Sequence, residues 1–316
     1  MKTVKLGFIV PNFPNEKRVA LLPQHIEDFE NQLYVETGFG ATLGITDEEY
    51  ASKGCTILDR SEIYKKCDAI FNLKLTQPSD YKYLKSGQMI LGWTHPFGSG
   101  ADFYNGIAKD LKLKIVDLDN IYPRVFHNGI IRNINFIPKN FVWKNSFNAG
   151  YASTQHALLC FGLVPDSNTK IAVLASGSVS QGAYYVASKY GSDVRMFYRK
   201  TMNEFYDSID SFDIIINGIE VDNDNDHIIS SRDLDLLKKN TLIIDAAADA
   251  GRAIYGTKYT SIDNPIYKEN ELYFYVVNNA PSIIYRKSSF DISKSFSNWV
   301  YKYDVKRFGD LLGAIK

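Results

Sequence analysis

KIAVLASGSVSQGA, the stretch from Lys170 to Ala183, decides the fold. It begins with an apolar run of strand length, continues with a turn of small residues and leads into a run with helical spacing. Such a turn lets the backbone approach a phosphate at the N-terminus of the helix, as in dinucleotide-binding folds. Aligned on Gly177, it reads Ala175-x-Gly177-x-x-Ser180, with Gly182 two positions later. We interpret it as a degenerate dinucleotide fingerprint, and an ordinary tight turn is the alternative.

The next strand-like run indicates which dinucleotide would bind. Val194–Tyr198 is followed by Arg199, Lys200 and Thr201, with no carboxylate. A ribose 2′-hydroxyl is usually bound by Asp or Glu, whereas a 2′-phosphate requires cations. We therefore expect NADP(H) as the cofactor, and a solvated basic loop is the alternative. The residues expected to contact it are Ser176, Gly177, Ser178, Val179, Ser180, Gly182, Arg199 and Lys200.

Composition excludes several classes of protein. The 316 residues include 36 basic and 36 acidic side chains, so the chain lacks the basic excess that nucleic acid or an anionic membrane would require. The 45% hydrophobic content argues against disorder. The cysteines Cys55, Cys67 and Cys160 form no C-x-x-C pair, so we expect no disulfide framework and no metal site. With no leader and no membrane-length apolar run, a cytoplasmic location is expected.

Strand-like and helix-like runs alternate in both halves of the chain. Strands are expected at Lys5–Val10, Leu33–Glu36, Ala69–Lys74, Met89–Thr94 and Lys114–Leu118, and again at Lys170–Ala175, Asp193–Tyr198, Phe212–Asn217, Thr241–Ala246 and Leu272–Asn278. Helices are expected at Leu22–Gln32, Thr46–Ser52, Ala101–Leu113, Tyr151–Phe161, Val179–Tyr190 and Arg232–Lys239. Such alternation predicts parallel sheets covered on both faces.

The expected fold class is therefore α/β, with two doubly wound, Rossmann-like parallel-sheet domains and an interdomain cleft. Residues 1–148 and 281–316 are expected to form a substrate (catalytic) domain, and residues 149–280 an NADP-binding Rossmann domain. Toward the end of residues 1–148, Asn128-Gly129 predicts a hairpin that projects near the domain junction. The acidic run at residues 222–226 is interpreted as a solvated turn, because His227 stands where a calcium loop needs glycine.

Three polar side chains follow strands of the first half. They are Arg18, Lys74 and His95, and the carboxyl ends of parallel strands meet at one edge of a sheet. A guanidinium can bind a carboxylate through two parallel hydrogen bonds, an ammonium can bind a carbonyl or carboxylate oxygen, and an imidazole can move protons near neutral pH. This combination favours a small α-keto acid as substrate.

Several motifs resemble those of the alanine dehydrogenase and transhydrogenase family, over nearly the whole chain. They are EKRVALLP at 16–23, ETGFG at 36–40, NLKLTQP at 72–78, WTHP at 93–96, DAAADAG at 245–251 and NAP at 279–281. The resemblance implies that Arg18 and Lys74 anchor the keto acid and that His95 transfers protons. It also implies that Asp249 supplies a carboxylate across the cleft, that Asn279 lies by the nicotinamide, and that the protein is a homo-oligomer, with a tetramer suggested.

Longer segments are similar to an NADPH-dependent member of that family. They are FPNEKRVALLP, LTQPSDY, GWTHPFGSGADF, DLDNIYPR, FYRKTMNEFYDSI and IINGIEVD. This resemblance implies reductive condensation of pyruvate with the side-chain amine of ornithine, or of lysine, to give the N(5)-carboxyethyl derivative. The alternatives are alanine dehydrogenase activity with ammonia and an inactive NADP-binding sensor. Asp102, Asp119 and Arg124 are candidates for binding the second substrate.

Overall fold

The computed structural model describes residues 3–221 and 227–313, so the acidic run at 222–226 lies outside the described residues. The chain divides into a first unit, Met1–Val142 with Tyr285–Lys316, and a second unit, Trp143–Ile284. The sequence suggested boundaries at 148/149 and 280/281. The first boundary differs because one continuous helix, α4 (Trp143–Phe161), begins earlier than its apolar spacing indicated and belongs wholly to the second unit. The second boundary falls instead at the start of helix α8 (Tyr285–Phe296).

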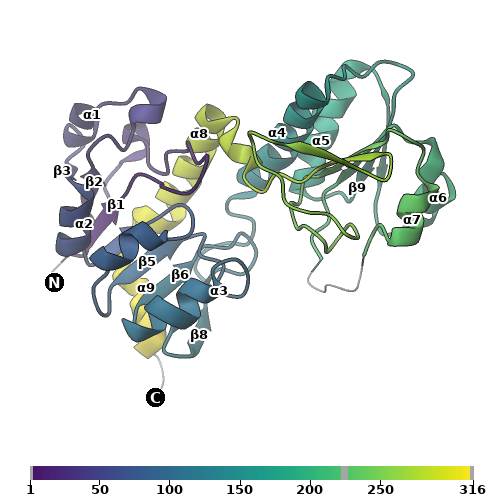
Figure 1. The fold of residues 1–316 in the computed structure, drawn as a ribbon. Helices are drawn as coiled ribbons and strands as arrows, with labels where there is room; N and C mark the ends of the chain where they lie inside the picture. The colour runs from purple at the N-terminus through teal and green to yellow at the C-terminus, as the bar shows by residue number, and fades with distance from the viewer. Residues whose placement is uncertain (1–2, 222–226, 314–316) are drawn as a thin grey trace. The chain divides into compact units, whose positions relative to one another are not determined.

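The described part of the first unit is built on an eight-stranded sheet with the order β3-β2-β1-β4-β5-β6-β7-β8 (Figure 1). Strands β1 to β6 all run parallel to one another, whereas β7 and β8 are antiparallel to their neighbours. The bounds are β1 (Lys5–Phe8), β2 (Gln32–Glu36), β3 (Thr56–Leu58), β4 (Ala69–Phe71), β5 (Met89–Gly92), β6 (Lys114–Asp117), β7 (Arg124–His127) and β8 (Ile130–Asn133).

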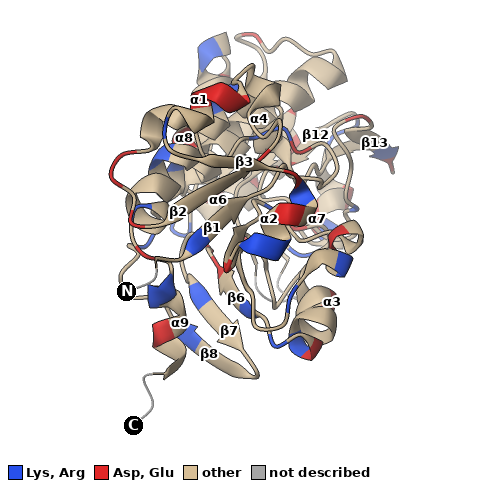
Figure 2. Cartoon of the chain, turned by 90° about the vertical axis from the view of Figure 1, so that its left-hand side faces the viewer, with Lys and Arg blue, Asp and Glu red and all other residues tan. Residues whose placement is uncertain are grey.

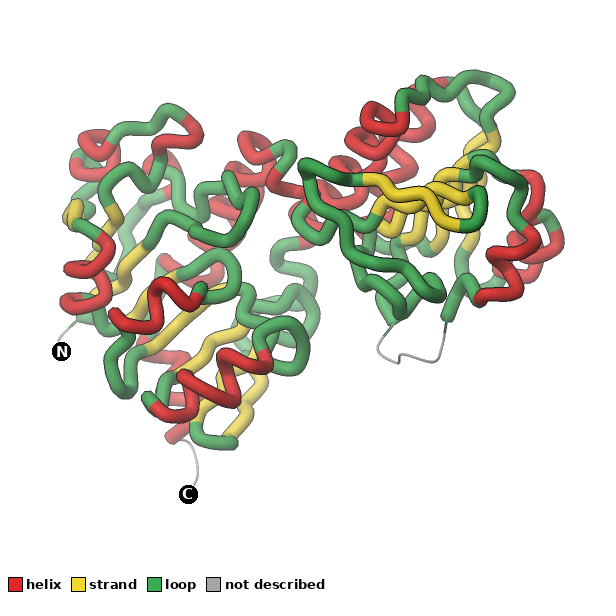
Figure 3. The backbone as a smooth tube through the Cα atoms, viewed as in Figure 1, coloured by secondary structure: helices red, strands yellow, loops and turns green. Residues whose placement is uncertain are grey.

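Both faces of this sheet are covered, because side chains alternate along each strand between two apolar cores. Helices α2 (Arg60–Lys66) and α3 (Ala101–Phe103) pack on one face, and α8 (Tyr285–Phe296) and α9 (Lys306–Gly313) pack on the other (Figure 3). The segment from α8 to α9 therefore contributes to the first unit's core. Basic and acidic residues are interspersed over the elements visible in Figure 2.

Local sequence signals were reliable in parts of this unit and failed in others. The short helix α1 (Asp47–Ala51) forms within the expected range Thr46–Ser52 and begins with a capping box of Thr46 and Glu49. The helix expected at Leu22–Gln32 is wrong, since only a 3-10 turn forms at Pro23–His25. The amide of Asn31 instead donates to the carbonyl oxygens of Tyr301 and Tyr303, which ties this segment to the C-terminal part of the chain.

Two other expectations for the first unit also need correction. The helix expected at Ala101–Leu113 is interrupted, because α3 passes into a π-helical turn at Tyr104–Ala108 in which Gly106 has non-helical backbone angles. The hairpin at Asn128-Gly129 forms, but it does not project from the domain. Its strands β7 and β8 extend the main sheet, with Asp117 of β6 opposite Arg124 of β7.

The described part of the second unit has a six-stranded sheet with the order β10-β9-β11-β12-β14-β13, in which only β13 is antiparallel to its neighbour. Helices α4 and α5 (Ser178–Ala187) pack on one face, and α6 (Met202–Asp207) and α7 (Ser231–Leu236) lie on the other. The strands are β9 (Lys170–Leu174), β10 (Asp193–Phe197), β11 (Ile214–Asn217), β12 (Leu242–Asp245), β13 (Ile266–Glu269) and β14 (Leu272–Tyr275). No helix among the described residues is long and apolar enough to span a bilayer.

Candidate active site

Arg18 lies in the loop after β1 and is paired with Glu16. Its Nε donates to Oε1 of Glu16 at 2.8 Å and its Nη2 donates to Oε2 at 2.6 Å, and both side chains are buried. Burial alone would raise the pKa of Glu16, but the neighbouring guanidinium outweighs this effect and lowers it. The sequence suggested that Arg18 binds a substrate carboxylate, but the edge of its guanidinium formed by Nε and Nη2 is occupied by a carboxylate of the chain itself.

Lys74 follows β4 and lies beside this pair. Its ammonium nitrogen is 5.7 Å from the ring centres of Phe13 and Trp93, and Arg18 lies 5.1 Å from the same Trp93 ring. Among the described residues, Lys74 makes no hydrogen bond or ion pair. Burial and the charge of Arg18 lower the pKa of Lys74 to about 8, although Glu16 acts in the opposite direction. Lys74 is thus an available cation whose charge is lost just above neutral pH.

His95 is fixed by Asp117, the last residue of β6. One oxygen of the Asp117 carboxylate, Oδ1, accepts hydrogen bonds from the backbone N–H of Thr94 at 2.9 Å and of His95 at 3.1 Å. These contacts stabilise His95 at a φ of 42°, a left-handed conformation that is unfavourable for a non-glycine residue. Burial lowers the pKa of the imidazole while Asp117 acts to raise it. The imidazole is therefore mainly neutral at pH 7 and able to accept a proton.

The loops that carry these groups are fixed by close packing and by helix α8. Gly92 at the end of β5 has a φ of 151°, and a Cβ there would lie 1.7 Å from the carbonyl oxygen of Asn72, so only glycine permits this approach. The backbone N–H of Val19, next to Arg18, donates to Oγ of Ser289 at 2.8 Å. Ser293 accepts the N–H of Leu22 in the same way. Two serines of α8 thus hold the loop that contains Arg18.

In the second unit, the turn after β9 has the conformation that a phosphate-binding turn requires. Ala175 has a φ of 76°, which is the conformation that glycine adopts at the first position of the fingerprint. Gly177 is the N-cap of α5, and Ser176 and Gly177 are exposed while Ser178 and Val179 are half-buried. The backbone N–H groups at the start of this helix could hold a pyrophosphate.

Two of the residues expected to contact the cofactor are instead packed inside the second unit. Ser180 is buried and its hydroxyl donates to the carbonyl oxygen of Leu174 at 2.6 Å. Gly182 lies where α5 crosses α4, and a Cβ there would be 2.0 Å from the carbonyl oxygen of Phe147. Both residues therefore support the turn from behind.

Arg199 and Lys200 follow β10 in a turn held by Thr201, whose hydroxyl accepts the backbone N–H of Tyr198 at 3.0 Å. Both cationic side chains are exposed, and neither forms a hydrogen bond or ion pair within the described part of the chain. They stand at the carboxyl edge of the sheet, as the α5 turn does, because β10 and β9 are parallel neighbours. Two free cations at this position fit an anionic group on the adenosine ribose.

Asp249 and Asn279 follow β12 and β14 at the same edge. Asp249 is partly buried, with Oδ1 at 3.6 Å from Nε of Arg252. Asn279 is buried and begins the 3-10 turn Ala280–Ser282. Nearby Asp245 is fully buried, accepts a hydrogen bond from Asn217 at 3.0 Å, and has its pKa raised to about 6 by burial.

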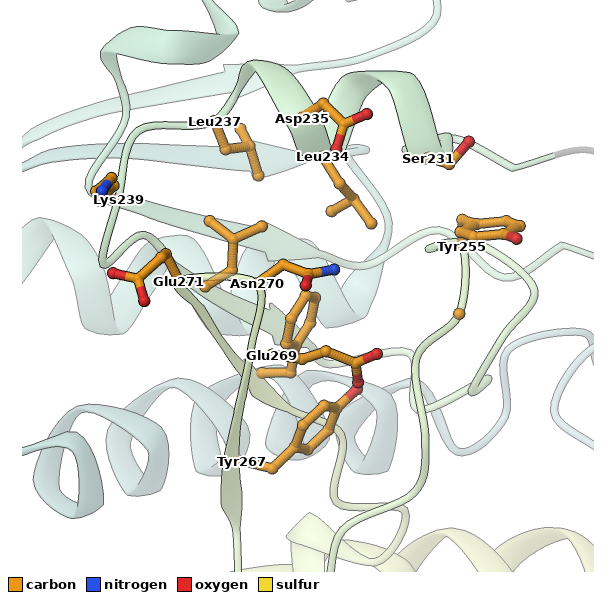
Figure 4. Close-up of a pocket in the computed structure, with 13 residues that line it drawn as sticks. Ser231, Leu234, Asp235, Leu237, Lys239, Tyr255, Tyr267, Glu269, Asn270 and Glu271 are labelled. Carbon is orange, nitrogen blue, oxygen red and sulfur yellow. The ribbon is translucent and has the colours of Figure 1, made fainter.

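A separate pocket in the second unit lies away from this edge (Figure 4). Leu234 and Asp235 of α7 face Tyr267 and Glu269 of the β13–β14 hairpin across it. Leu272, the first residue of β14, also lines it, so it adjoins the amino ends of the strands. It is therefore distinct from the turn of α5. No cluster of His, Cys, Asp or Glu within residues 3–221 and 227–313 could hold a metal ion.

The structure brings together Arg18, Lys74 and His95 in the first unit, and Asp249, Asn279 and the α5 turn share one edge of the second. Sequence reasoning missed Glu16 and Asp117. Asp117 ends a strand that the sequence predicted, so the same rule that selected Lys74 and His95 would have found it. Glu16 gave no comparable signal, because its pairing with Arg18 depends on the conformation of a loop.

The fold and these groups define a pyridine-nucleotide-dependent oxidoreductase. Family models described as "Alanine dehydrogenase/PNT, N-terminal domain" and "Alanine dehydrogenase/PNT, C-terminal domain" match residues 12–122 and 168–312, and the chain belongs to this family. It is 54% identical over 315 residues to a protein of Clostridium botulinum named N(5)-(carboxyethyl)ornithine synthase, covering 99% of both chains. A Lactococcus lactis subsp. lactis protein of the same name is 52% identical, covering 96% of this chain and 97% of the other.

More distant relatives share the fold. Alanine dehydrogenase 1 of Staphylococcus aureus is 22% identical, covering 90% of this chain and 83% of that protein. Among solved structures, an L-alanine dehydrogenase aligns with a TM-score of 0.78 at 16% identity, covering 94% of this chain and 89% of the other. A transhydrogenase from Sinorhizobium meliloti aligns with a TM-score of 0.74 at 17% identity, covering 98% and 96%. Both confirm the expected fold class of two α/β, mainly parallel-sheet domains.

Proposed function

We propose that the protein catalyses the NADPH-dependent reductive condensation of pyruvate with the side-chain amine of ornithine, forming N(5)-(carboxyethyl)ornithine. The observation that carries this proposal is the identity of 52–54%, over nearly the full length, to proteins named for that reaction. The amine adds to the keto carbon, water leaves, and the resulting imine is reduced to a secondary amine.

The keto acid is held by the first unit. Because Glu16 already pairs with Arg18, Lys74 is the cation that meets the carboxylate of pyruvate directly. Arg18 and Lys74 both lie over the Trp93 ring, so the Arg18–Glu16 pair helps to place the Lys74 ammonium. The apolar ring of Trp93, near which both cations lie, also suits the methyl group of pyruvate.

His95 moves the protons. The side-chain amine of ornithine has a solution pKa near that of lysine, about 10.4, so it must lose a proton before it can attack. A neutral imidazole at His95 can accept this proton and return it to the departing hydroxyl group, a general acid–base role worth roughly 10²- to 10⁴-fold in rate. Asp249 would orient the imine nitrogen.

The cofactor site of the second unit fits NADPH, which when bound supplies the hydride. The α5 turn would hold the pyrophosphate, and Arg199 and Lys200 would bind the 2′-phosphate. Their exposure and lack of partners within the described residues support this assignment. Asn279 would contact the nicotinamide. The homo-oligomeric state and the cytoplasmic location stay predictions.

The test follows NADPH oxidation with pyruvate while ornithine, lysine and ammonia are offered in turn. We expect turnover with ornithine well above turnover with ammonia. The Arg199→Gln/Lys200→Gln double variant should raise the KM for NADPH at least about tenfold, because losing even one charge-assisted contact has an effect of that size. The KM for NADH should not change. Arg195→Gln is the matched control, since Arg195 is an exposed cation of β10 that pairs with Asp193. Turnover with ammonia alone would contradict the proposal.

A further inference from the structure

Two groups that would bind an amino-acid head group lie after the carboxyl end of β6, with Asp119 in the turn to β7 and Arg124 at the start of β7. Arg124 opens β7 and stands opposite Asp117, which holds the backbone of His95. Because directly opposite residues of an antiparallel pair project from the same face of the sheet, the Arg124 side chain is on the same side as Asp117. Arg124 thus belongs to the edge at which the proposed chemistry takes place.

Arg124 is positioned by aromatic rings and not by a carboxylate. Its guanidinium carbon lies 5.9 Å from the ring centre of Phe97 and 5.6 Å from that of Tyr122. Its Nε donates a hydrogen bond to Oδ1 of Asn133 at 3.3 Å. Arg124 forms no ion pair with any of the described residues. A guanidinium that lies over aromatic rings and forms no ion pair within the described residues is suited to bind an external carboxylate.

The same turn supplies an anion. Oδ1 of Asp119 accepts the backbone N–H of Ile121 at 2.8 Å and of Tyr122 at 2.6 Å, which shapes the turn. No hydrogen bond or ion pair within the described residues uses its second oxygen. Asp119 acts to raise the pKa of His95, as a nearby negative charge does, so it lies within electrostatic reach of the imidazole.

Two exposed aromatic rings lie beside Arg124. Phe97 is 65% exposed and Tyr122 is 57% exposed, although both rings belong to a unit with a well-filled core. Phe97 packs its ring against Phe126 with a centroid distance of 5.3 Å, so its position is fixed despite the exposure. Fixed, exposed rings next to a cation and an anion can contact the methylene groups of an aliphatic side chain.

We propose that Arg124 and Asp119 bind the α-carboxylate and α-ammonium groups of the second substrate, an amino acid whose side chain carries the reacting amine. Phe97 and Tyr122 contact the methylene spacer, which directs the terminal amine toward His95. This assignment rests on the proposed function and adds to it the residues that distinguish a diamino acid from ammonia or a simple amine. The carboxylate of pyruvate is not its ligand, since Lys74 serves that role.

The test compares ornithine with two analogues that each lack one head-group charge. 1,4-Diaminobutane lacks the carboxylate and 5-aminopentanoate lacks the α-ammonium group, while both keep a terminal amine. Arg124→Gln should raise the KM for ornithine by about 10- to 100-fold, as expected for a lost charge-assisted contact. It should leave the KM for 1,4-diaminobutane, pyruvate and NADPH within about twofold. Asp119→Asn, which keeps the Oδ1 acceptor of the turn, should instead remove the preference for ornithine over 5-aminopentanoate.

Arg132→Gln is the matched control for folding and for general charge. Arg132 belongs to the same hairpin, but it stands opposite Val125 and so lies on the other face of the sheet from Arg124. An unchanged preference for ornithine over 1,4-diaminobutane in Arg124→Gln, or an equal loss in Arg132→Gln, would overturn the inference. If the unaltered protein turns over ornithine and Arg124→Gln has the same KM for ornithine, only the head-group site is rejected. Turnover of ammonia but not ornithine rejects both this site and the proposed function.

Discussion

Lys74 offers a sharp test of the proposed keto-acid site, because burial and Arg18 lower the pKa of its ammonium to about 8. With that pKa, the protonated fraction falls from about nine-tenths at pH 7 to about one-tenth at pH 9. Only the protonated form attracts a carboxylate. The affinity for the keto acid should therefore weaken about tenfold between these two pH values, with a midpoint near 8.

The measurement is the inhibition constant of oxamate, an unreactive analogue of pyruvate, against pyruvate at several pH values. An inhibition constant avoids the titration of the amine substrate, which would itself raise the rate as pH rises. In Lys74→Arg the guanidinium remains charged, so the constant should be level up to pH 9. Lys82→Arg, an exposed lysine near a different ring, should keep the midpoint of the unaltered protein. A constant that does not vary in the unaltered protein, or that varies equally in Lys74→Arg, would refute the reasoning.

Other substitutions test single contacts. Burial raises the pKa of Asp245 to about 6 in the folded state, so ionisation of its carboxyl group destabilises the fold above that pH. In urea unfolding, Asp245→Asn should therefore raise the free energy of unfolding by about 1–3 kcal/mol at pH 7.5, and by less at pH 4.5. Ser289→Ala removes the acceptor of the Val19 N–H and should lower the free energy of unfolding by about 1–3 kcal/mol. It should also raise the KM for pyruvate more than it lowers kcat. Ser289→Thr keeps the hydroxyl and should restore both the stability and the KM. Ala175→Gly relieves a φ of 76° and should raise the unfolding free energy by about 1 kcal/mol, measured by thermal unfolding.

The parts of the fold that the sequence predicted depend on short-range patterns. The strand, turn and helix around Gly177 follow from residues that are close together in the chain, as does the capping box at Thr46. The segment expected as a helix at Leu22–Gln32 failed for the opposite reason. Its conformation is set by Asn31, which binds the backbone of Tyr301 and Tyr303, and no local pattern reveals a partner so far along the chain.

Some residues of the candidate site could likewise be predicted from short-range patterns, and others could not. Lys74 and His95 could be selected because each follows a buried strand, and parallel strands end at one edge. The partners of such groups are harder to predict, since Glu16 is one of many carboxylates in the sequence and only the loop geometry pairs it with Arg18. Strain was also hidden, because the positive φ of His95 depends on hydrogen bonds from Asp117, which lies on a different strand.

The pairing of Arg18 with Glu16 affects which keto acid the proposed site would hold. Glu16 cancels the charge of Arg18, so Lys74 leaves one net positive charge among the three groups. A monocarboxylate such as pyruvate neutralises that charge. A second carboxylate on the substrate would stand without a counter-charge near Trp93 and Phe13, whose rings interact favourably with cations and not with anions. Since an unpaired charge in a partly desolvated site is costly, we expect the proposed site, with Glu16 paired to Arg18, to favour a small monoanionic keto acid.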